Sequence, residues 1–309
     1  MCGIAGIIYR DGSHPVGADM TRMLQSMKHR GPDSTGYALY GPASDAYLMR
    51  VMIAEGPVNG DVEGRERLER NRREVEERLR ALGARVLGID GAVPHAINVT
   101  FEYDGELEVL SSRLESISGV EVLSIGHSLE IVKDLGDART VSEEYSLDQF
   151  QGSHGIGHVR MATESDVDIS GAHPYWAYPF SDVAVVHNGQ LTNYFDWRRR
   201  LERRGRRFRS ENDSEVIAVY LADKMDQGLS LEQAMRDSLE ELDGVFTYIC
   251  VTKDELGMAK DELAAKPLVL YESDDIVALA SEEIALRAIF DHEIETYDPY
   301  ESEVMVWQR

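Results

Sequence analysis

The sequence predicts an α+β fold in which stacked sheets are flanked by helices, with a separate α/β unit inserted between residues 57 and 145. Apolar strand-like runs and helical periodicities come in blocks and do not alternate one by one, a pattern typical of packed sheets with helices outside them. The 309 residues, 43% of them hydrophobic, can bury a sizeable core. A change in charge density near Gly56 separates the inserted unit from segments 1–56 and 146–309, which form the main predicted domain.

The first segment is predicted to hold a strand, a short helix and two more strands. Small residues after Cys2, in Gly-Ile-Ala-Gly, indicate a tight buried strand that other backbone can approach closely. Apolar residues at helical spacing predict a helix over 20–28, and the Gly-Pro turn that follows ends it. Strands beginning at Gly36 and at Ala46 come next, with a hairpin as the simplest way to pair them.

The inserted unit begins with a highly charged helix over 61–84, in which Glu and Arg stand four residues apart. Such pairs support an exposed helix by about 0.2–0.5 kcal/mol each. A strand, a helix and two strands are predicted to follow at 96–103, 106–117, 120–126 and 129–134. The unit resembles a ferredoxin-like module and is expected to be structural or to dock a partner. Neither His95 nor His127 has sequence neighbours that suggest a metal site.

The last segment repeats the pattern of strands followed by helices. A glycine-rich strand begins at Gly155, and a buried strand from Asp182 is expected to end at Asn188-Gly189, a dipeptide suited to positive φ. A helix follows from Asn193, and Asn212-Asp-Ser-Glu resembles a capping box that starts another. The remaining elements are predicted as a helix at 230–242, strands near 245–252, 256–259, 267–271 and 275–280, a helix at 282–290 and a strand at 303–307.

Composition narrows the class of protein. The formal charge of -24 repels phosphate backbones and anionic lipids, which disfavours nucleic-acid and membrane-surface roles. No apolar run is long enough to span a bilayer, and no transit peptide is recognised. The two cysteines, Cys2 and Cys250, cannot form a disulfide framework. The expected location is therefore the cytoplasm.

Cys2 is the first candidate catalytic residue. Removal of Met1 would leave a thiol and a free α-amine on the same residue. The amine titrates near pH ~8 and the thiol near ~8.5, so a neutral amine can take the thiol proton at neutral pH. This is the arrangement of an N-terminal nucleophile, in which one residue is both nucleophile and base. The alternative is an accidental cysteine in a frayed terminus.

Five motifs set Cys2 in a wider pattern. In order along the chain they are Cys2-Gly-Ile-Ala-Gly, Arg30-Gly-Pro-Asp-Ser, Gly157-His-Val-Arg-Met-Ala-Thr, His187-Asn-Gly and Asn212-Asp-Ser-Glu-Val. Together they resemble the class II glutamine amidotransferases, which are N-terminal-nucleophile hydrolases with a four-layer αββα sandwich. The resemblance covers 1–55 and about 150–290 but not the insert. The sequence has no cysteine cluster and no phosphate-binding glycine loop, so no cofactor and no metal are expected in this chain.

The resemblance implies catalytic roles for three residues. Cys2 would attack the side-chain amide of glutamine, and its α-amine would pass the thiol proton to the departing ammonia. The side-chain NH2 of Asn188 and the N–H of Gly189 would hold the oxyanion, a contribution typically worth about 10²–10³ in rate per donor. Taken alone, Asn188-Gly189 could be only a turn.

Four more residues are implied to bind substrate or shape its site. Arg160 would bind the α-carboxylate of glutamine, Asp213 the α-ammonium, and Thr163 would assist near the carboxylate. Arg30 would order the loop around Cys2. The alternatives are a structural ion pair for Arg160 and a favourable charge at a helix N-terminus for Asp213. The nearby histidines His158 and His187 are expected to be structural.

The sequence contains no synthase domain that would use the ammonia, and this affects the functional prediction. Relatives usually carry a fused synthase domain, for which this chain has no room, so it resembles a stand-alone amidotransferase subunit. Arg160-Met-Ala-Thr-Glu-Ser followed by His173-Pro174 resembles the subunit of archaeal-type glutamate synthase, with N-methylglutamate synthase as the close alternative. FMN and iron–sulfur clusters are then expected on partner subunits. An acylase for a different amide and a regulatory subunit with a degenerate site are the competing classes of protein.

One basic cluster stands out in this acidic chain. Eight of the twelve residues from Arg198 to Arg209 are arginine. The cluster is either a solvated helix face and turn or a docking patch for an acidic partner. The patch and the insert are the two predicted docking surfaces.

Overall fold

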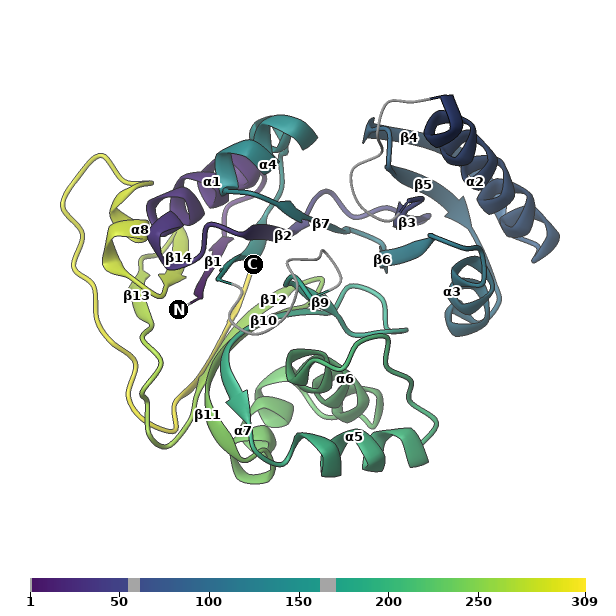
Figure 1. The fold of residues 1–309 in the computed structure, drawn as a ribbon. Coiled ribbons are helices and arrows are strands. Elements are labelled where there is room, and N and C mark those ends of the chain that lie inside the picture. Colours follow the sequence, from purple (N-terminus) through teal and green to yellow (C-terminus); the bar gives the residue numbers. More distant parts are fainter. Residues whose placement is uncertain (1, 55–61, 162–170) are drawn as a thin grey trace.

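The computed structural model describes residues 2–54, 62–161 and 171–309 (Figure 1). Their strands form three antiparallel sheets of six, five and four strands. The six- and five-stranded sheets pack face to face, and helices cover the outer face of each (Figure 1). This is the four-layer αββα sandwich that the sequence analysis expects. No helix in the described ranges is long and apolar enough to cross a bilayer.

The six-stranded sheet contains the first strand of the chain. Its order is β13 (Val269–Glu272), β14 (Ile276–Ala280), β1 (Gly3–Tyr9), β8 (His154–Arg160), β2 (Ser34–Tyr40) and β7 (Leu129–Leu135). Its outer face packs against α1 (Val16–Ser26), α4 (Ala138–Tyr145) and α8 (Glu283–Arg287), with the short 3-10 helices η1 (Lys28–Arg30) and η2 (Leu147–Gln149). The helix α4 was not predicted; its N-cap Asp137 accepts the N–H of Thr140.

The five-stranded sheet forms the other inner layer. Its order is β15 (Val304–Gln308), β12 (Glu255–Lys260), β11 (Gly244–Val251), β10 (Ala184–Leu191) and β9 (Tyr175–Trp176). Its outer face packs against α5 (Tyr194–Arg203), α6 (Asp213–Asp226) and α7 (Leu231–Glu241). A capping box between Ser230 and Gln233 starts α7.

The glycines of β1 and β8 explain why these strands look unusual in the sequence. A Cβ on Gly6 would stand 3.3 Å from Ile249 and Leu256 of the opposite sheet. A Cβ on Gly157 would stand 2.6 Å from Leu24 of α1. Glycine therefore lets the second sheet approach on one side and a helix on the other, as expected for a closely packed strand.

The third sheet belongs to the insert, and its topology is ferredoxin-like. The elements follow the order β3 (Tyr47–Met52), α2 (Val62–Ala81), β4 (Arg85–Val93), β5 (Ala96–Glu102), α3 (Leu107–Glu115) and β6 (Glu121–Gly126). The strands lie side by side as β4-β5-β3-β6. Two β-α-β halves therefore interlock in one antiparallel sheet, with β3 in an inner position. The insert is called the module below.

Two predictions about connections are wrong. The strands β2 and β3 do not form a hairpin, because β2 pairs with β7 and β8 whereas β3 pairs with β5 and β6. The neighbouring strands β6 and β7 lie in different sheets. The module's sheet thus spans 47–126, while residues 129–145 pack in the main domain, in contrast to the expected division at 57 and 145. Strand alternation alone identifies β3 and β7 as strands but does not identify their partners.

Asp182 stabilises the turn between β6 and β7, where the chain passes from the module's sheet to the six-stranded sheet. Its carboxylate accepts the backbone N–H groups of His127, Ser128 and Leu129 at 2.8–3.0 Å. A Cβ on Gly126 would lie 2.3 Å from the same carboxylate, so glycine is required there. These bonds satisfy the backbone of the β6–β7 turn, which can then leave the module and enter the main sheet.

Candidate active site

Cys2 lies immediately before β1, and two distant side chains bind its backbone. Its carbonyl oxygen accepts hydrogen bonds from Arg30 Nε at 2.9 Å and from Asn188 Nδ2 at 3.3 Å. Cys2 is partly exposed, whereas Arg30 and Asn188 are buried. The fold therefore brings three of the predicted residues together at the thiol.

Asn188 and Gly189 lie inside β10 and are not a turn. The strand continues to Leu191, so the interpretation that it ends at Asn188-Gly189 is wrong. Successive side chains of a strand alternate between faces. Asn188 therefore shares the inward face with Val186, toward the other sheet and Cys2, while His187 shares the outward face with Val185, toward α6.

Gly189 presents an open backbone edge next to Asn188. Its φ is 142°, and a Cβ would lie 2.1 Å from the carbonyl oxygen of Val245, so only glycine fits. In the described part of the chain, β9 pairs only with Ala184 and Val185 of β10. The N–H of Leu191 points to this open edge, where Asp213 accepts it at 2.8 Å. Alternation directs the N–H of Gly189 to the same edge, where it can meet a developing oxyanion.

Asp213 is the first residue of α6, and its carboxylate is held from several sides. It accepts the Leu191 N–H and lies 3.6 Å from His187 Nδ1. Burial opposes ionisation, but the contacts with His187 and the backbone N–H groups outweigh it and lower the pKa of Asp213. Asn212 is the N-cap, as predicted. The reciprocal half of the expected capping box is absent from the described contacts, because Glu215 accepts the N–H groups of Arg209 and Ser210.

Two buried histidines contact the hydroxyl of Ser214, next to Asp213, and a third stacks on one of them. His173 Nε2 lies 2.6 Å and His187 Nδ1 2.9 Å from Ser214 Oγ, and the rings of His158 and His173 stack at 4.1 Å. Burial lowers the pKa of His158 to about 3 and the pKa of His173 well below its usual value. Both imidazoles are therefore neutral at pH 7. The link from His173 through Ser214 was missed, although both residues lie in motifs that the sequence displays.

Arg160 ends β8 at the same end of the sandwich as Cys2. The register pairs Gly3 with Val159, so the next position along β8 lies opposite Cys2. Its guanidinium packs on Gly171, where a Cβ would stand only 3.0 Å from Nη1. Thr163, predicted to assist near the carboxylate, lies outside the described residues.

Glu282 anchors Arg30 and was not predicted. Arg30 Nη1 lies 2.6 Å from Glu282 Oε1, and His29 approaches the other oxygen at 2.9 Å. Burial opposes ionisation, yet the hydrogen bonds from Arg30 and His29 lower the pKa of Glu282. Because Arg30 also binds the Cys2 carbonyl, Glu282 acts as a positioning residue for the thiol. No local sequence pattern marks it, since its partner lies 252 residues away.

His95 lies near two carboxylates that could bind a metal together with it, although its sequence neighbours suggest no metal site. Ligand atoms of His95, Asp134 and Glu144 lie within 4.8 Å of one another. However, Tyr145 OH already contacts His95 Nε2 at 3.0 Å and Asp134 at 2.8 Å. We therefore interpret this cluster as the contact between the β4–β5 turn of the module and α4.

The arrangement at Cys2 suits acyl transfer from the amide side chain of a free amino acid. The structure places a thiol next to a side-chain amide NH2 and next to the strand edge that carries the Gly189 N–H, and such donors can stabilise an oxyanion. The Asp213 carboxylate lies at that strand edge, and Arg160 is the position of β8 opposite Cys2, so groups of opposite charge are available for the α-ammonium and α-carboxylate of an amino acid.

Comparisons with known proteins agree with this chemistry. A glutamine amidotransferase domain family matches residues 158–288. The chain is 40% identical to a Methanothermobacter thermautotrophicus protein named "Putative glutamine amidotransferase", over 98% of this chain and 99% of that protein. It is 37% identical to the glutamine amidotransferase-like protein GlxB of Rhizobium meliloti, over 99% of this chain and 98% of that protein.

Solved structures agree on the fold. The glutamine phosphoribosylpyrophosphate amidotransferase of B. subtilis aligns with a TM-score of 0.61, and an allosteric regulatory enzyme of purine biosynthesis aligns with 0.63. Each is 18% identical, and the alignment covers 99% of this chain but 47% of the solved chain. At this identity the likeness concerns the fold alone. Together with the relatives of matching length, it shows that the chain belongs to the class II glutamine amidotransferases, enzymes that act on amide carbon–nitrogen bonds.

Proposed function

We propose that this chain is an amidotransferase subunit that hydrolyses L-glutamine to glutamate and ammonia through a thioester on Cys2. The thiol sulfur attacks the side-chain amide carbon, while the α-amine of Cys2 takes the thiol proton and gives it to the departing ammonia. Water then cleaves the thioester and releases glutamate. The observation that supports this most is the convergence of Arg30 and Asn188 on the Cys2 carbonyl, which fixes the nucleophile beside an oxyanion donor.

Substrate recognition is assigned to the charged groups around Cys2. Asp213 is ionised and lies at the open edge of β10, where it would bind the α-ammonium. Arg160 would bind the α-carboxylate through its planar fork. Thr163 is proposed to assist at the carboxylate, as the resemblance implies. These charges select a free amino acid over an acyl group in a peptide or lipid.

The ammonia acceptor is proposed to lie on a separate synthase subunit, namely glutamate synthase. The proposal is supported by the two relatives of matching length, because 99% and 98% of their length aligns with this chain. FMN and iron–sulfur clusters would then reside on the partner subunits. N-methylglutamate synthase is the alternative partner. A cytoplasmic location stays a prediction.

Ammonia release from L-glutamine by the purified chain tests the glutaminase activity. Cys2→Ala should reduce the rate by at least about 10³-fold, as expected for loss of a nucleophile. Cys250→Ala is the matched control, because Cys250 is fully buried in β11 and burial raises the pKa of its thiol. Full activity of Cys2→Ala would contradict the proposal.

Co-purification followed by an acceptor assay tests the partner. The chain and an FMN-containing synthase subunit should form glutamate from 2-oxoglutarate and glutamine. Cys2→Ala should remove this activity but retain activity with added ammonium. A complex that ignores 2-oxoglutarate and amidates another acceptor would overturn the glutamate synthase assignment and leave the glutaminase assignment intact.

A further inference from the structure

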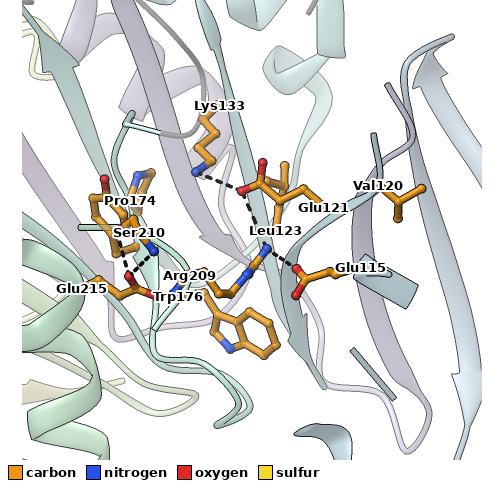
Figure 2. A pocket seen from close by; sticks show the side chains of 11 residues that line it. Glu115, Val120, Glu121, Leu123, Lys133, Pro174, Trp176, Arg209, Ser210 and Glu215 are labelled. Atoms are coloured by element: carbon orange, nitrogen blue, oxygen red, sulfur yellow. Dashed lines mark hydrogen bonds and ion pairs between the residues drawn. The ribbon is translucent and has the colours of Figure 1, made fainter. Parts of the chain in front are cut away.

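Two arginines of the segment predicted as a docking patch, Arg207 and Arg209, bind the module of the same chain, whereas Arg204 and Arg206 pair with acidic residues of α6. Arg207 Nε lies 2.9 Å from Glu108 of α3. Arg209 forms an ion pair with Glu115 of α3 and lies 3.7 Å from Glu121 of β6 (Figure 2). At least part of the acidic partner expected for this patch is therefore the module.

The contact between Arg209 and the module borders a cavity. The cavity has a volume of about 330 Å³ and lies between the module's Glu115, Val120, Glu121 and Leu123 and the main domain's Lys133, Trp176 and Arg209 (Figure 2). The Arg209 guanidinium also stands 5.9 Å from the Trp176 ring and 5.6 Å from the Tyr178 ring. Around the cavity, the ion pairs of Arg209 lie beside buried apolar side chains of Val120, Leu123 and Trp176, which belong to the core that the two parts share. The ion pairs are partly exposed and can change without loss of that core.

Arg209 is connected to the glutamine site through the start of α6. Its N–H and that of Ser210 each donate to Glu215 at 2.8 Å, and the Glu215 side chain is buried. The same short segment continues to Asn212, the N-cap of α6, and to Asp213. A movement of Arg209 therefore acts on the turn that places the Asp213 carboxylate.

Lys133 provides a second connection to the same helix end. Its ammonium lies 3.8 Å from Glu121 of the module and 3.4 Å from the carbonyl oxygen of Ala172. The next residue, His173, contacts the hydroxyl of Ser214, which follows Asp213. Glu121 thus lies between two cations, Arg209 and Lys133 (Figure 2). Each cation is connected through hydrogen-bonded neighbours to residues at the N-terminus of α6.

We propose that the module controls glutamine affinity, with Glu115, Glu121 and Arg209 acting as positioning residues for Asp213. A module held by these ion pairs keeps the start of α6 in the geometry that binds the α-ammonium. A protein or ligand that shifts the module changes this geometry without touching Cys2. The proposal rests on the proposed function, because that function assigns Asp213 to the ammonium of glutamine.

Steady-state kinetics on neutral variants of the module test this coupling. The double variant Glu115→Gln, Glu121→Gln should raise KM for glutamine about three- to tenfold, which lies within the range of typical coupling energies, with kcat within about twofold of wild type. Arg209→Ala should do the same, and Arg209→Lys should recover part of the affinity because it retains the charge. Arg207→Ala is the matched control, since Arg207 also bridges to the module but is 63% exposed and lies outside the Glu215 contact.

Two outcomes would overturn the coupling. One is an unchanged KM in the double variant on the module, whatever Arg209→Ala does. The other is an equal rise in KM for Arg207→Ala, which would indicate general loosening of the contact. Calorimetric titration of glutamine into each variant in a Cys2→Ala background measures affinity without turnover. A wild-type chain that binds glutamine but releases no ammonia would contradict the proposed function and leave the coupling testable by this titration.

Discussion

The candidate active site and the module contact both join polar residues from distant parts of the chain, but they are built differently. At the active site, Asn188 and Arg30 are buried and bind Cys2 at 2.9–3.3 Å. At the module contact, Glu121 is 38% exposed and its two cations stand 3.7–3.8 Å away beside a cavity. Buried, directly bonded groups fix a geometry, whereas partly exposed ion pairs are weak and adjustable. The first arrangement suits catalysis and the second suits control.

Asn188→Ala should produce a large effect at the active site. Loss of one oxyanion donor should lower kcat by about 10²–10³-fold with little change in KM, because the bond forms mainly in the transition state. Steady-state ammonia release measures both constants. Gln190→Ala is the control, since Gln190 lies on the same face of β10 two residues further and is exposed. An unchanged kcat in Asn188→Ala would remove Asn188 from the oxyanion site.

Asp213→Asn and Arg160→Ala should have the next largest effect, on KM. Each removes one charge that we assign to glutamine in both ground and transition states, so KM should rise about 10–100-fold while kcat changes little. Asp226→Asn, at the far end of α6 and 54% exposed, is the control for the helix. A fall in kcat with unchanged KM would argue against ground-state recognition by these residues.

A smaller effect is expected on the pH dependence of stability, through a histidine that is buried in the rigid core. Burial lowers the pKa of His154 to about 4, from about 6.5 when unfolded. Between these two pH values the folded state binds fewer protons at His154 than the unfolded state does. The free energy of unfolding is therefore highest, as far as His154 is concerned, above about pH 6.5, and it falls as the pH falls toward 4. In urea unfolding between pH 6 and 5, the free energy of unfolding of the wild type should fall by about 1 kcal/mol per pH unit more than that of His154→Asn.

The comparison of the two proteins isolates His154 from other groups. Burial raises the pKa of Glu115 and of Glu130, which acts in the opposite direction but in wild type and variant alike. Equal pH slopes for the two proteins would show that His154 is not held neutral by the core.

The smallest effect is expected on the outer helix of the module. Glu76→Ala removes an ion pair with Arg80, whose side chain is 64% exposed. The free energy of unfolding should change by at most about 0.5 kcal/mol, and KM for glutamine should stay within error. Chemical denaturation and steady-state kinetics check the two values. A clear rise in KM would mean that the whole module, and not its ion pairs with Arg209 and Lys133, determines affinity.

Much of the active site could be predicted because its residues lie in short motifs near strand and helix ends. Cys2, Asn188 and Arg30 occupy such motifs, and the structure brings them together. Glu282 and the His173–Ser214 contact could not be predicted, because their partners are distant and no periodicity links them. Their positions follow from packing, which a local pattern does not report.

The fold shows the same limit. Strand and helix periodicity predicts most elements and the layered architecture, since each element buries an apolar face. The change of sheet between β6 and β7 is accompanied instead by contacts of Asp182, which satisfies the β6–β7 turn from more than fifty residues away in the sequence. The arginine segment illustrates the point again, because its composition indicates acidic partners but not that they lie on α6 and on the module of the same chain.

Peptide mapping of the enzyme during turnover tests the central claim most directly. We expect the N-terminal peptide to begin at Cys2, without Met1, and to carry a glutamyl thioester on Cys2 when glutamine is present. The adduct should disappear after glutamine is consumed and should be absent with glutamate alone. Active enzyme that retains Met1 completely, or that turns over glutamine with no adduct on Cys2 under rapid quenching, would contradict the claim that Cys2 is both nucleophile and base.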